Sequence, residues 1–192
     1  LNDNYVTTAN INIVTYLNVT NKSISDLTGI EDFTALTSLD CFNNQLTSLD
    51  VSNNTALVYL YCFNNQLTSL DVSNNTALTE LVFENNQLTS LDVSNNTALT
   101  ILHCYNNQLT SLDVSNNTAL VGLWCSDNQL TSLDVRNGNN GNMNDFKSFN
   151  NPNLSCISVD DPAWSTTNWS NIDATTSFAI SCSQEAGYTY VP

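Results

Sequence analysis

A mainly β solenoid of stacked 21-residue coils, with short parallel strands on both sides and little helix, is the fold that the sequence predicts. The segment LTSLDVSNNTAL occurs at 46–57, 67–78, 88–99 and 109–120, always 21 residues apart. Both halves of each unit follow one pattern, Leu-x-x-Leu-x-apolar-x-x-Asn. A unit this short cannot bury its own leucines, so the coils must stack on one another to form a continuous core.

The regular coils are flanked by less regular segments. LTSLDCFNNQ at 36–45 is the same unit, and weaker copies of the pattern reach back to residue 14. We therefore divide the chain into four parts: 1–35, an N-terminal cap remnant with an irregular first coil; 36–141, the regular coils; 142–182, a C-terminal cap; and 183–192, a linker towards a further domain.

Alternation along each short strand decides which side chains form the core. Leu60 and Cys62 should face inward, while Tyr59, Tyr61 and Phe63 face outward. The asparagine that ends each half-coil should also face inward and bond the turn backbone, which cannot stay unpaired when it is buried. Two columns result: Asn44, Asn65, Asn86, Asn107 and Asn128 on one side, and Asn54, Asn75, Asn96 and Asn117 on the other, where the column is expected to end at Gly138.

Four of the six cysteines occupy one inward position of the repeat. They are Cys41, Cys62, Cys104 and Cys125, and the remaining coil carries Phe83 at that position. Phenylalanine replaces a small buried hydrophobe acceptably but cannot replace a metal ligand, so we predict buried, inert thiols. A disulfide between stacked neighbours would be strained because their Cβ vectors are parallel. A zinc site needs about four converging ligands.

The other two cysteines, Cys156 and Cys182, lie outside the repeat and flank an irregular segment that contains tryptophan. A disulfide between them would close a long loop over the last coil, with an expected contribution on the order of 3 kcal/mol. We predict this disulfide, which fits an oxidising compartment.

Composition and spacing argue against several classes of function. The formal net charge is −15 with only three basic residues, which disfavours nucleic acid and anionic lipid surfaces as partners. No apolar run approaches the roughly 18 residues of a membrane span, so we expect no membrane insertion. His103 and Cys104 are adjacent, but strand alternation places them on opposite faces, so they cannot act as a nucleophilic pair. We expect neither enzymatic activity nor a cofactor.

The repeat resembles the leucine-rich repeats of secreted Bacteroidota proteins with nested 21-residue LxxLxCxxNxLxxLDLxxNxx units. The resemblance is close over 36–137 and loose over 14–35, and 151–182 resembles the C-terminal cap of that group. It implies an extracellular protein, secreted or attached to the cell surface, that binds through its strand face. We also infer that Tyr190-Val191-Pro192 opens a next unit, in a tandem array of such domains.

One half of every coil is constant and the other varies, and this contrast suggests where a partner binds. The outward residues of the variable half include exposed aromatic side chains of the kind enriched at interfaces. The candidate binding residues are Phe42, Tyr59, Tyr61, Phe63, His103, Tyr105 and Trp124. The expected partner is a protein or glycan on another surface, or a neighbouring copy of the domain. Two alternatives stay open: the aromatic rings only cover one another, or the domain is a structural stalk or filament unit without a specific ligand.

The constant half carries one outward carboxylate per coil. These residues form an Asp column: Asp50, Asp71, Asp92, Asp113 and Asp134. Like charges about 4.8 Å apart repel by about 0.9 kcal/mol per neighbouring pair even in water. Serine hydroxyls, counterions or bound Ca²⁺ would offset this repulsion. The column is therefore a candidate calcium site, although one carboxylate per coil favours a solvated charged face.

Overall fold

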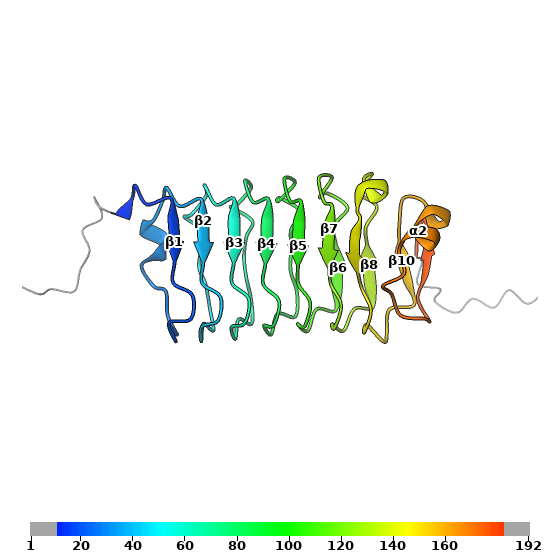
Figure 1. Cartoon of the computed structure of the whole chain (residues 1–192), viewed down its shortest axis with the longest axis horizontal. Helices are drawn as coiled ribbons and strands as arrows, with labels where there is room; N and C mark the ends of the chain where they lie inside the picture. Colours follow the sequence, from blue (N-terminus) through cyan, green and yellow to red (C-terminus); the bar gives the residue numbers. More distant parts are fainter. Residues whose placement is uncertain (1–10, 183–192) are drawn as a thin grey trace, which may run out of the picture.

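The computed structural model describes residues 11–182 as a single stack of coils along the long axis of the molecule (Figure 1). The variable half of each coil contributes a strand to a parallel, seven-stranded sheet. In spatial order its strands are β1 (Tyr16–Asn18), β2 (Ser38–Asp40), β3 (Tyr59–Tyr61), β4 (Glu80–Val82), β5 (Ile101–His103), β7 (Gly122–Trp124) and β9 (Asp145–Lys147). Each strand pairs with the corresponding residues of the next coil, so Leu60 lies beside Leu81 and Leu81 beside Leu102.

A second parallel sheet forms on the opposite side of the coils. It has four strands, in the order β11 (Ser177–Ala179), β10 (Cys156–Ser158), β8 (Ser132–Asp134) and β6 (Ser111–Asp113). Within residues 11–182 the helical segments are short: η1 (Ile30–Asp32), η2 (Asn140–Asn142) and α2 (Pro162–Asn168). The structure thus confirms the predicted fold class, a mainly β solenoid with parallel strands on two sides and little helix.

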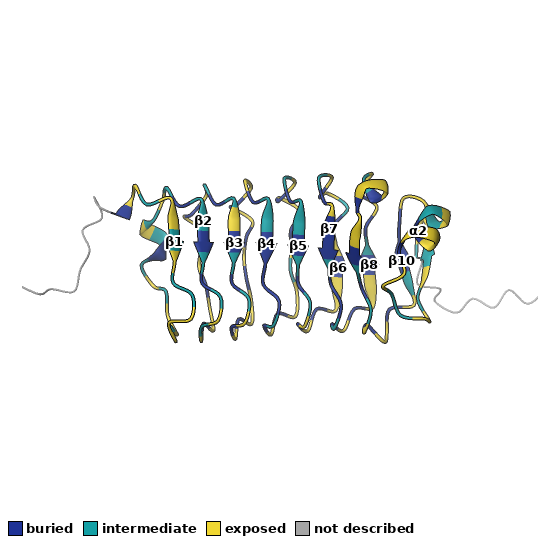
Figure 2. Cartoon of the chain, in the orientation of Figure 1, coloured by how far each residue is buried: buried dark blue, intermediate teal, exposed yellow. Residues whose placement is uncertain are grey.

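The core is one continuous column of aliphatic side chains between the two sides. Leu60, Leu81 and Leu102 have no exposed surface, and neither do the four repeat cysteines. Figure 2 shows the buried residues recurring at the same place in successive coils. Phe83 is also fully buried, which confirms that it replaces cysteine as a core residue.

The buried asparagines join one coil to the next. Asn65 accepts a hydrogen bond from the Leu46 amide at 3.0 Å and donates from Nδ2 to the Cys41 and Cys62 carbonyls at 3.1 and 3.0 Å. The same arrangement recurs at Asn86, Asn107, Asn128 and Asn151. Each amide therefore satisfies backbone groups that the turn would otherwise bury unpaired.

The second asparagine column continues one step further than predicted. We expected it to end at Gly138, but Asn137 is buried and donates from Nδ2 to the Asn117 carbonyl at 3.0 Å. Asn137 takes this role because the coil is one residue shorter here: the two asparagines are 20 positions apart in the sequence. Gly138 follows with a φ of 73°, in the left-handed region that glycine adopts readily.

The turn after each strand of the seven-stranded sheet needs a left-handed residue. From Asn43 to Asn150, that residue has φ between 53° and 57°. Asparagine and aspartate tolerate this conformation better than other residues with side chains. The positions are Asn43, Asn64, Asn85, Asn106, Asp127 and Asn150. This requirement explains the first asparagine of the repeated NNQ sequence.

Both sheets extend into the segment assigned as the C-terminal cap. β9 adds the last strand to the seven-stranded sheet, and β10 and β11 continue the four-stranded sheet. Between them, α2 begins at Pro162, where the Asp161 side chain accepts hydrogen bonds from two backbone amides of the first turn. Trp169 stacks on Phe146 with 4.1 Å between ring centroids and so covers the end of the core.

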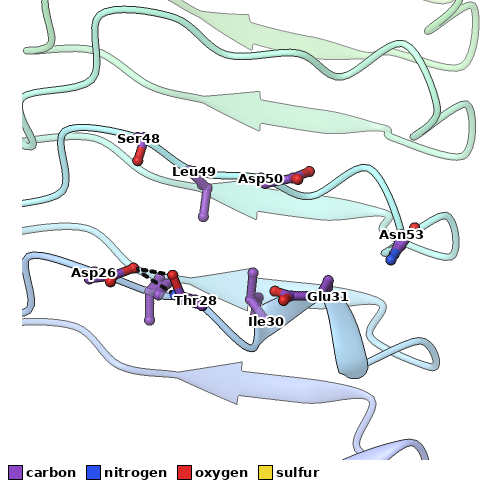
Figure 3. A pocket seen from close by; sticks show the side chains of 9 residues that line it. Asp26, Thr28, Ile30, Glu31, Ser48, Leu49, Asp50 and Asn53 are labelled. Carbon is purple, nitrogen blue, oxygen red and sulfur yellow. Dashed lines mark hydrogen bonds between the residues drawn. The ribbon is translucent and has the colours of Figure 1, made fainter.

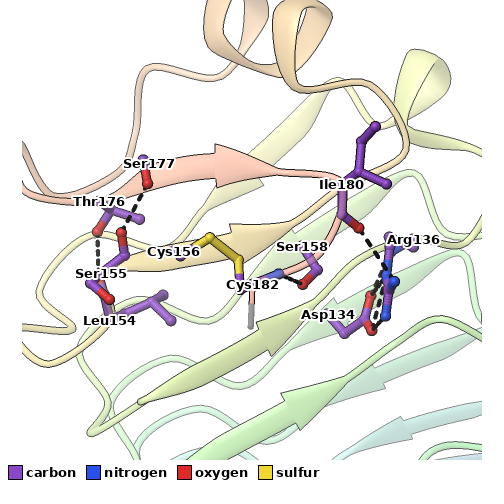
Figure 4. The surroundings of a disulfide bond; sticks show 10 residues. All are labelled: Asp134, Arg136, Leu154, Ser155, Cys156, Ser158, Thr176, Ser177, Ile180 and Cys182. Atoms are coloured by element: carbon purple, nitrogen blue, oxygen red, sulfur yellow. Dashed lines mark hydrogen bonds and ion pairs between the residues drawn. A yellow bond between two sulfur atoms is a disulfide. The ribbon is translucent and has the colours of Figure 1, made fainter. Parts of the chain in front are cut away.

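The predicted disulfide between Cys156 and Cys182 is present (Figure 4). It joins β10 to the chain that follows β11, with 5.8 Å between the two Cα atoms. The Cys182 amide also donates to Ser158 Oγ at 3.1 Å, which fixes the same segment. Three predicted features lie outside the described residues: residues 1–10 of the cap remnant and irregular first coil assigned to 1–35, the linker at 183–192, and the inferred start of a next unit. No helix in the described part of the chain is long and apolar enough to span a membrane.

Candidate functional site: the aromatic face

The outward side chains of the seven-stranded sheet lie in three rows along the solenoid, and we call this surface the aromatic face. The first row contains Tyr16, Ser38, Tyr59, Glu80, Ile101, Gly122 and Asp145, and the second Asn18, Asp40, Tyr61, Val82, His103, Trp124 and Lys147. The third contains Phe42, Phe63, Glu84, Tyr105, Ser126 and Phe149, as the backbone hydrogen bonds between successive turns show. All seven candidate binding residues therefore lie on one face.

Many of the rings stack from one coil to the next. Phe42 and Phe63 have centroids 4.2 Å apart with 9° between their planes, and His103 and Trp124 have centroids 4.1 Å apart with 8°. The rings thus turn their faces towards one another and their edges towards solvent. Tyr59 remains 39% exposed, and the other candidate residues are half-buried. Mutual covering of the rings, one of the alternatives left open by the sequence, is real but incomplete.

Charged groups are interleaved with the rings. Tyr61 donates a hydrogen bond from its hydroxyl to Glu80 Oε2 at 2.6 Å, and burial together with this bond raises the Tyr61 pKa well above its usual value. Lys147 Nζ lies 3.3 Å from the centroid of the Trp124 ring. Burial lowers the pKa of His103, so this ring is neutral at pH 7. The stacked histidine therefore acts as a planar group without charge.

Sequence reasoning missed the first coil of this face. Tyr16 is 54% exposed and donates from its hydroxyl to Asp40 Oδ2 at 2.8 Å, while Asn18 Nδ2 donates to the Tyr16 hydroxyl at 2.9 Å. The weak repeat at 14–23 places Tyr16 in register with Ser38 and Tyr59. Extending the outward positions back into that repeat would have found this residue.

Glu84 differs from the other residues of the third row. It is only 8% exposed, and its buried Oε2 has no hydrogen-bond partner among the described residues. Burial raises the pKa of this carboxyl, and hydrogen bonding by its own backbone and by Tyr105 only partly opposes that effect. Strand alternation places Glu84 on the outward side of the coil, but it does not show that the side chain is buried.

The Asp column lies in the constant half, away from the aromatic face. In Asp50, Asp71 and Asp92, the carboxylate accepts a hydrogen bond at 2.9 Å from the backbone amide two residues later. Side-chain hydrogen bonds from Ser52, Ser73 and Ser94, followed by these backbone bonds, lower the pKa of the three carboxyls. Serines are thus the partners that offset the repulsion along this column.

The calcium candidate gains no ligand cluster from the fold. Within residues 11–182, no group of three or more His, Cys, Asp or Glu side chains could hold a metal ion. Figure 3 shows a hollow at the start of the Asp column, lined by Asp26, Glu31 and Asp50. The Asp26 carboxylate there already accepts hydrogen bonds from the Thr28 amide and hydroxyl at 2.8 and 2.7 Å. At the other end of the column, Arg136 Nε donates to Asp134 Oδ1 at 2.9 Å.

The four repeat cysteines are free and fully buried, as predicted. Burial raises the pKa of Cys41 and of Cys125 to about 12, and it also raises the pKa of Cys62 and Cys104 well above the usual value. Because the thiolate is the reactive form, none of these thiols is a nucleophile at neutral pH. Cys104 lies in the core while His103 is on the aromatic face, so the two do not form a pair.

Comparison with known proteins gives one family match and several structural relatives. A family model described as the LVIVD repeat matches residues 57–82 and 81–106, about a quarter of the chain. Internalin J of Listeria monocytogenes is 52% identical over 42 residues, which are 22% of this chain and 5% of that protein.

Three solved structures illustrate the structural likeness. The functional domain of internalin J from Listeria monocytogenes, which includes a cysteine ladder, has a TM-score of 0.63 and 40% identity over 79% of this chain and 31% of that one. A second Listeria monocytogenes internalin has a TM-score of 0.59 and 23% identity over 84% and 52%. The ectodomain of the Arabidopsis thaliana receptor kinase GASSHO1/SCHENGEN3, solved with CASPARIAN STRIP INTEGRITY FACTOR 2, has a TM-score of 0.55 and 22% identity over 71% and 20%.

The chain spans less than a third of the internalin J domain that it resembles, and the relatives below 25% identity support the fold alone. Internalin-type leucine-rich-repeat domains are non-enzymatic, in agreement with the expectation from the sequence. They are typically interaction modules of surface proteins. The column of Cys41, Cys62, Cys104 and Cys125 also gives this chain a row of buried thiols, interrupted at Phe83. The chain is thus a leucine-rich-repeat solenoid similar to the Listeria internalins.

Proposed function

We propose that this domain is an extracellular recognition module that binds another protein through the aromatic face. The observation that carries the proposal is the contrast between the two halves of the coil. The constant half repeats LTSLDVSNNTAL four times, whereas the outward residues of the variable half change from coil to coil. A spacer needs no such variation, but a surface that fits one partner does.

The arrangement of the rings favours a protein over a glycan. Aromatic side chains are enriched at protein interfaces because they bury a large area and lose little conformational entropy. The stacked pairs Phe42–Phe63 and His103–Trp124 are already ordered, which lowers the entropy cost of binding further. A sugar ring would need an open aromatic face, whereas each ring of these pairs is covered on one face by its partner and turns its edge towards solvent.

Two further observations support the location and the class of partner. The Cys156–Cys182 disulfide is of the kind that persists outside the cytosol. The Arabidopsis receptor ectodomain with the same fold was solved with a bound factor. We therefore place the domain outside the cell, secreted or surface-attached. The repeat motif alone supports the finer proposal of a Bacteroidota source.

The test is a screen of the isolated domain on arrays of extracellular proteins and of glycans. A double variant, Phe42→Ser with Tyr59→Ser, should lose the bound protein while its circular dichroism spectrum stays unchanged. Ser69→Ala is the matched control, because Ser69 is exposed on the constant half. Equal binding by the double variant and the wild type would exclude the aromatic face as the binding surface.

A structural stalk is the second candidate, and the regularity of the asparagine columns favours it. Asn65 and its equivalents tie each coil to the next through the same hydrogen bonds, which makes a straight and rigid rod. In a tandem array such rods would set the reach of a surface protein, and weak binding sites on them would add by avidity. Absence of any ligand on both arrays at high protein concentration would favour this function over recognition.

A further inference from the structure

The third row of the aromatic face contains one residue that the fold does not require. Other coils place Phe42, Phe63, Tyr105 or Ser126 at this position, and each fits the same turn. Glu84 instead buries a carboxylate: 8% of the residue is exposed, and Oε2 has no hydrogen-bond partner within residues 11–182. Burying an uncompensated carboxylate is costly, so a role in packing does not explain its presence.

The described part of the chain supplies no cation to this carboxylate. The sequence has three basic residues, and two of them are engaged elsewhere: Arg136 with Asp134, and Lys147 with Asp145 and the Trp124 ring. The third, Lys22, lies in the turn of the first coil, where its amide bonds to Asn44. Glu84 is thus an anionic acceptor without a cationic partner in the described part of the chain.

Aromatic rings flank Glu84 on both sides along the solenoid. The Asn64 amide donates to the Glu84 carbonyl at 3.0 Å, and the Asn85 amide donates to the Tyr105 carbonyl at 3.1 Å. These bonds place Phe63 one coil before Glu84 and Tyr105 one coil after it. The Glu84 coil lies between these two coils, which are two strand spacings or about 9.6 Å apart, so a group from outside would contact the ring edges that face solvent. Phe63 is held in place by its stack on Phe42.

We propose that the Glu84 side chain turns outward to receive an arginine side chain of the protein partner, whose guanidinium packs against the solvent-facing edges of Phe63 and Tyr105 and donates to the carboxylate. This inference rests on the proposed function and specifies the chemistry of its partner. A guanidinium is planar, stacks on aromatic rings and presents a fork of donors that matches a carboxylate. An ammonium group lacks the planar shape and is more strongly hydrated.

The surrounding electrostatics favour a cation at this place. Glu80 lies two residues earlier on β4, where it accepts the Tyr61 hydroxyl, and His103 on the next strand is neutral. The net charge of −15 gives the whole domain an attraction for basic partners. The aromatic rings add cation–π attraction to the local site.

The test uses small amides as probes of the site. N-acetyl-arginine amide, its neutral analogue N-acetyl-citrulline amide and N-acetyl-lysine amide are titrated into the domain at constant ionic strength. Backbone amide chemical shifts are followed by nuclear magnetic resonance. The arginine amide should give saturable shifts at residues 63, 84 and 105, with at least tenfold weaker binding of the other two. Glu84→Gln should remove this preference, while Glu80→Gln keeps it.

Two results would overturn the inference: equal binding of the citrulline or lysine amide by the wild type, or an unchanged arginine preference in Glu84→Gln. The amide titration of the wild type decides the question even if a variant unfolds. A partner found on the array separates this inference from the proposed function. If that partner binds Glu84→Gln as tightly as wild type but does not bind the Phe42→Ser, Tyr59→Ser variant, the aromatic face is the binding surface and the arginine site at Glu84 is excluded.

Discussion

Removal of the Cys156–Cys182 disulfide should destabilise the C-terminal end of the solenoid by an amount that loop length sets. The two cysteines are 26 residues apart. The chain-entropy relation for a loop of that length gives about 3.5 kcal/mol at 25 °C. For a domain of this size, such a loss corresponds to a decrease in Tm of roughly 7–14 °C. The Cys156→Ser, Cys182→Ser double variant tests this value.

Tryptophan fluorescence in a urea titration is a suitable assay, because Trp164 and Trp169 both lie in the segment that the disulfide closes. Coils of a solenoid contact only their neighbours, so the loss should appear as an earlier transition of the C-terminal coils. Dithiothreitol added to the wild type should reproduce the effect, since the four other cysteines are free already. A change below about 1 kcal/mol in both experiments would show that β11 is held by its other contacts, such as the Thr176 hydroxyl on the Leu154 carbonyl at 2.6 Å.

Three further predictions concern the core and the two faces. Asn86→Ala should cost about 2–5 kcal/mol in the free energy of unfolding, because it leaves the Leu67 amide and two buried carbonyls without a hydrogen-bond partner. Gln87 is exposed, so Gln87→Ala should cost less than about 0.5 kcal/mol in the same urea titration. Glu84→Gln should be more stable than wild type at pH 7. Burial raises the pKa of the Glu84 carboxyl, so its protonated form stabilises the fold, and this stabilisation is lost as pH rises through that pKa. The stability gained by the variant should therefore vanish below about pH 4, and thermal melts that show it unchanged there would contradict this reasoning. The melting temperature should be the same in calcium and in a chelator, because serines already hydrogen-bond the carboxylates of the Asp column. A higher melting temperature in calcium would instead support a calcium site there.

The sequence was sufficient to predict the fold because each coil repeats the same physical requirements. Leucine at two fixed positions needs a shared core, and asparagine at the ninth position satisfies a buried turn. Where the repeat changed, the prediction was less accurate. Asn137 sits one residue earlier than the regular spacing would place it, so the column seemed to end at Gly138. The continuation of both sheets through β9, β10 and β11 depends on Phe146 and Ile157, which replace leucine in a segment without the repeated letters.

The composition of the aromatic face was predictable, but its interactions were not. Alternation identifies Phe42, Phe63, His103 and Trp124 as outward residues, since that depends only on strand period. Their stacking in pairs depends on side-chain torsions that no repeat pattern encodes. Lys147 was outside the predicted face because its strand belongs to the irregular segment, although it lies over Trp124.

Glu84 shows why the most informative residue of a repeat protein is one that departs from the repeat. A coil position that accepts phenylalanine, tyrosine or serine sets no demand for charge, so stability alone does not favour a buried carboxylate there. The same reasoning gives a different answer for the Asp column, where four successive coils carry the acid and a serine two residues later satisfies it. A charge that the fold repeats and satisfies belongs to the fold, whereas a charge that occurs once and lacks a partner is explained by a molecule outside the chain.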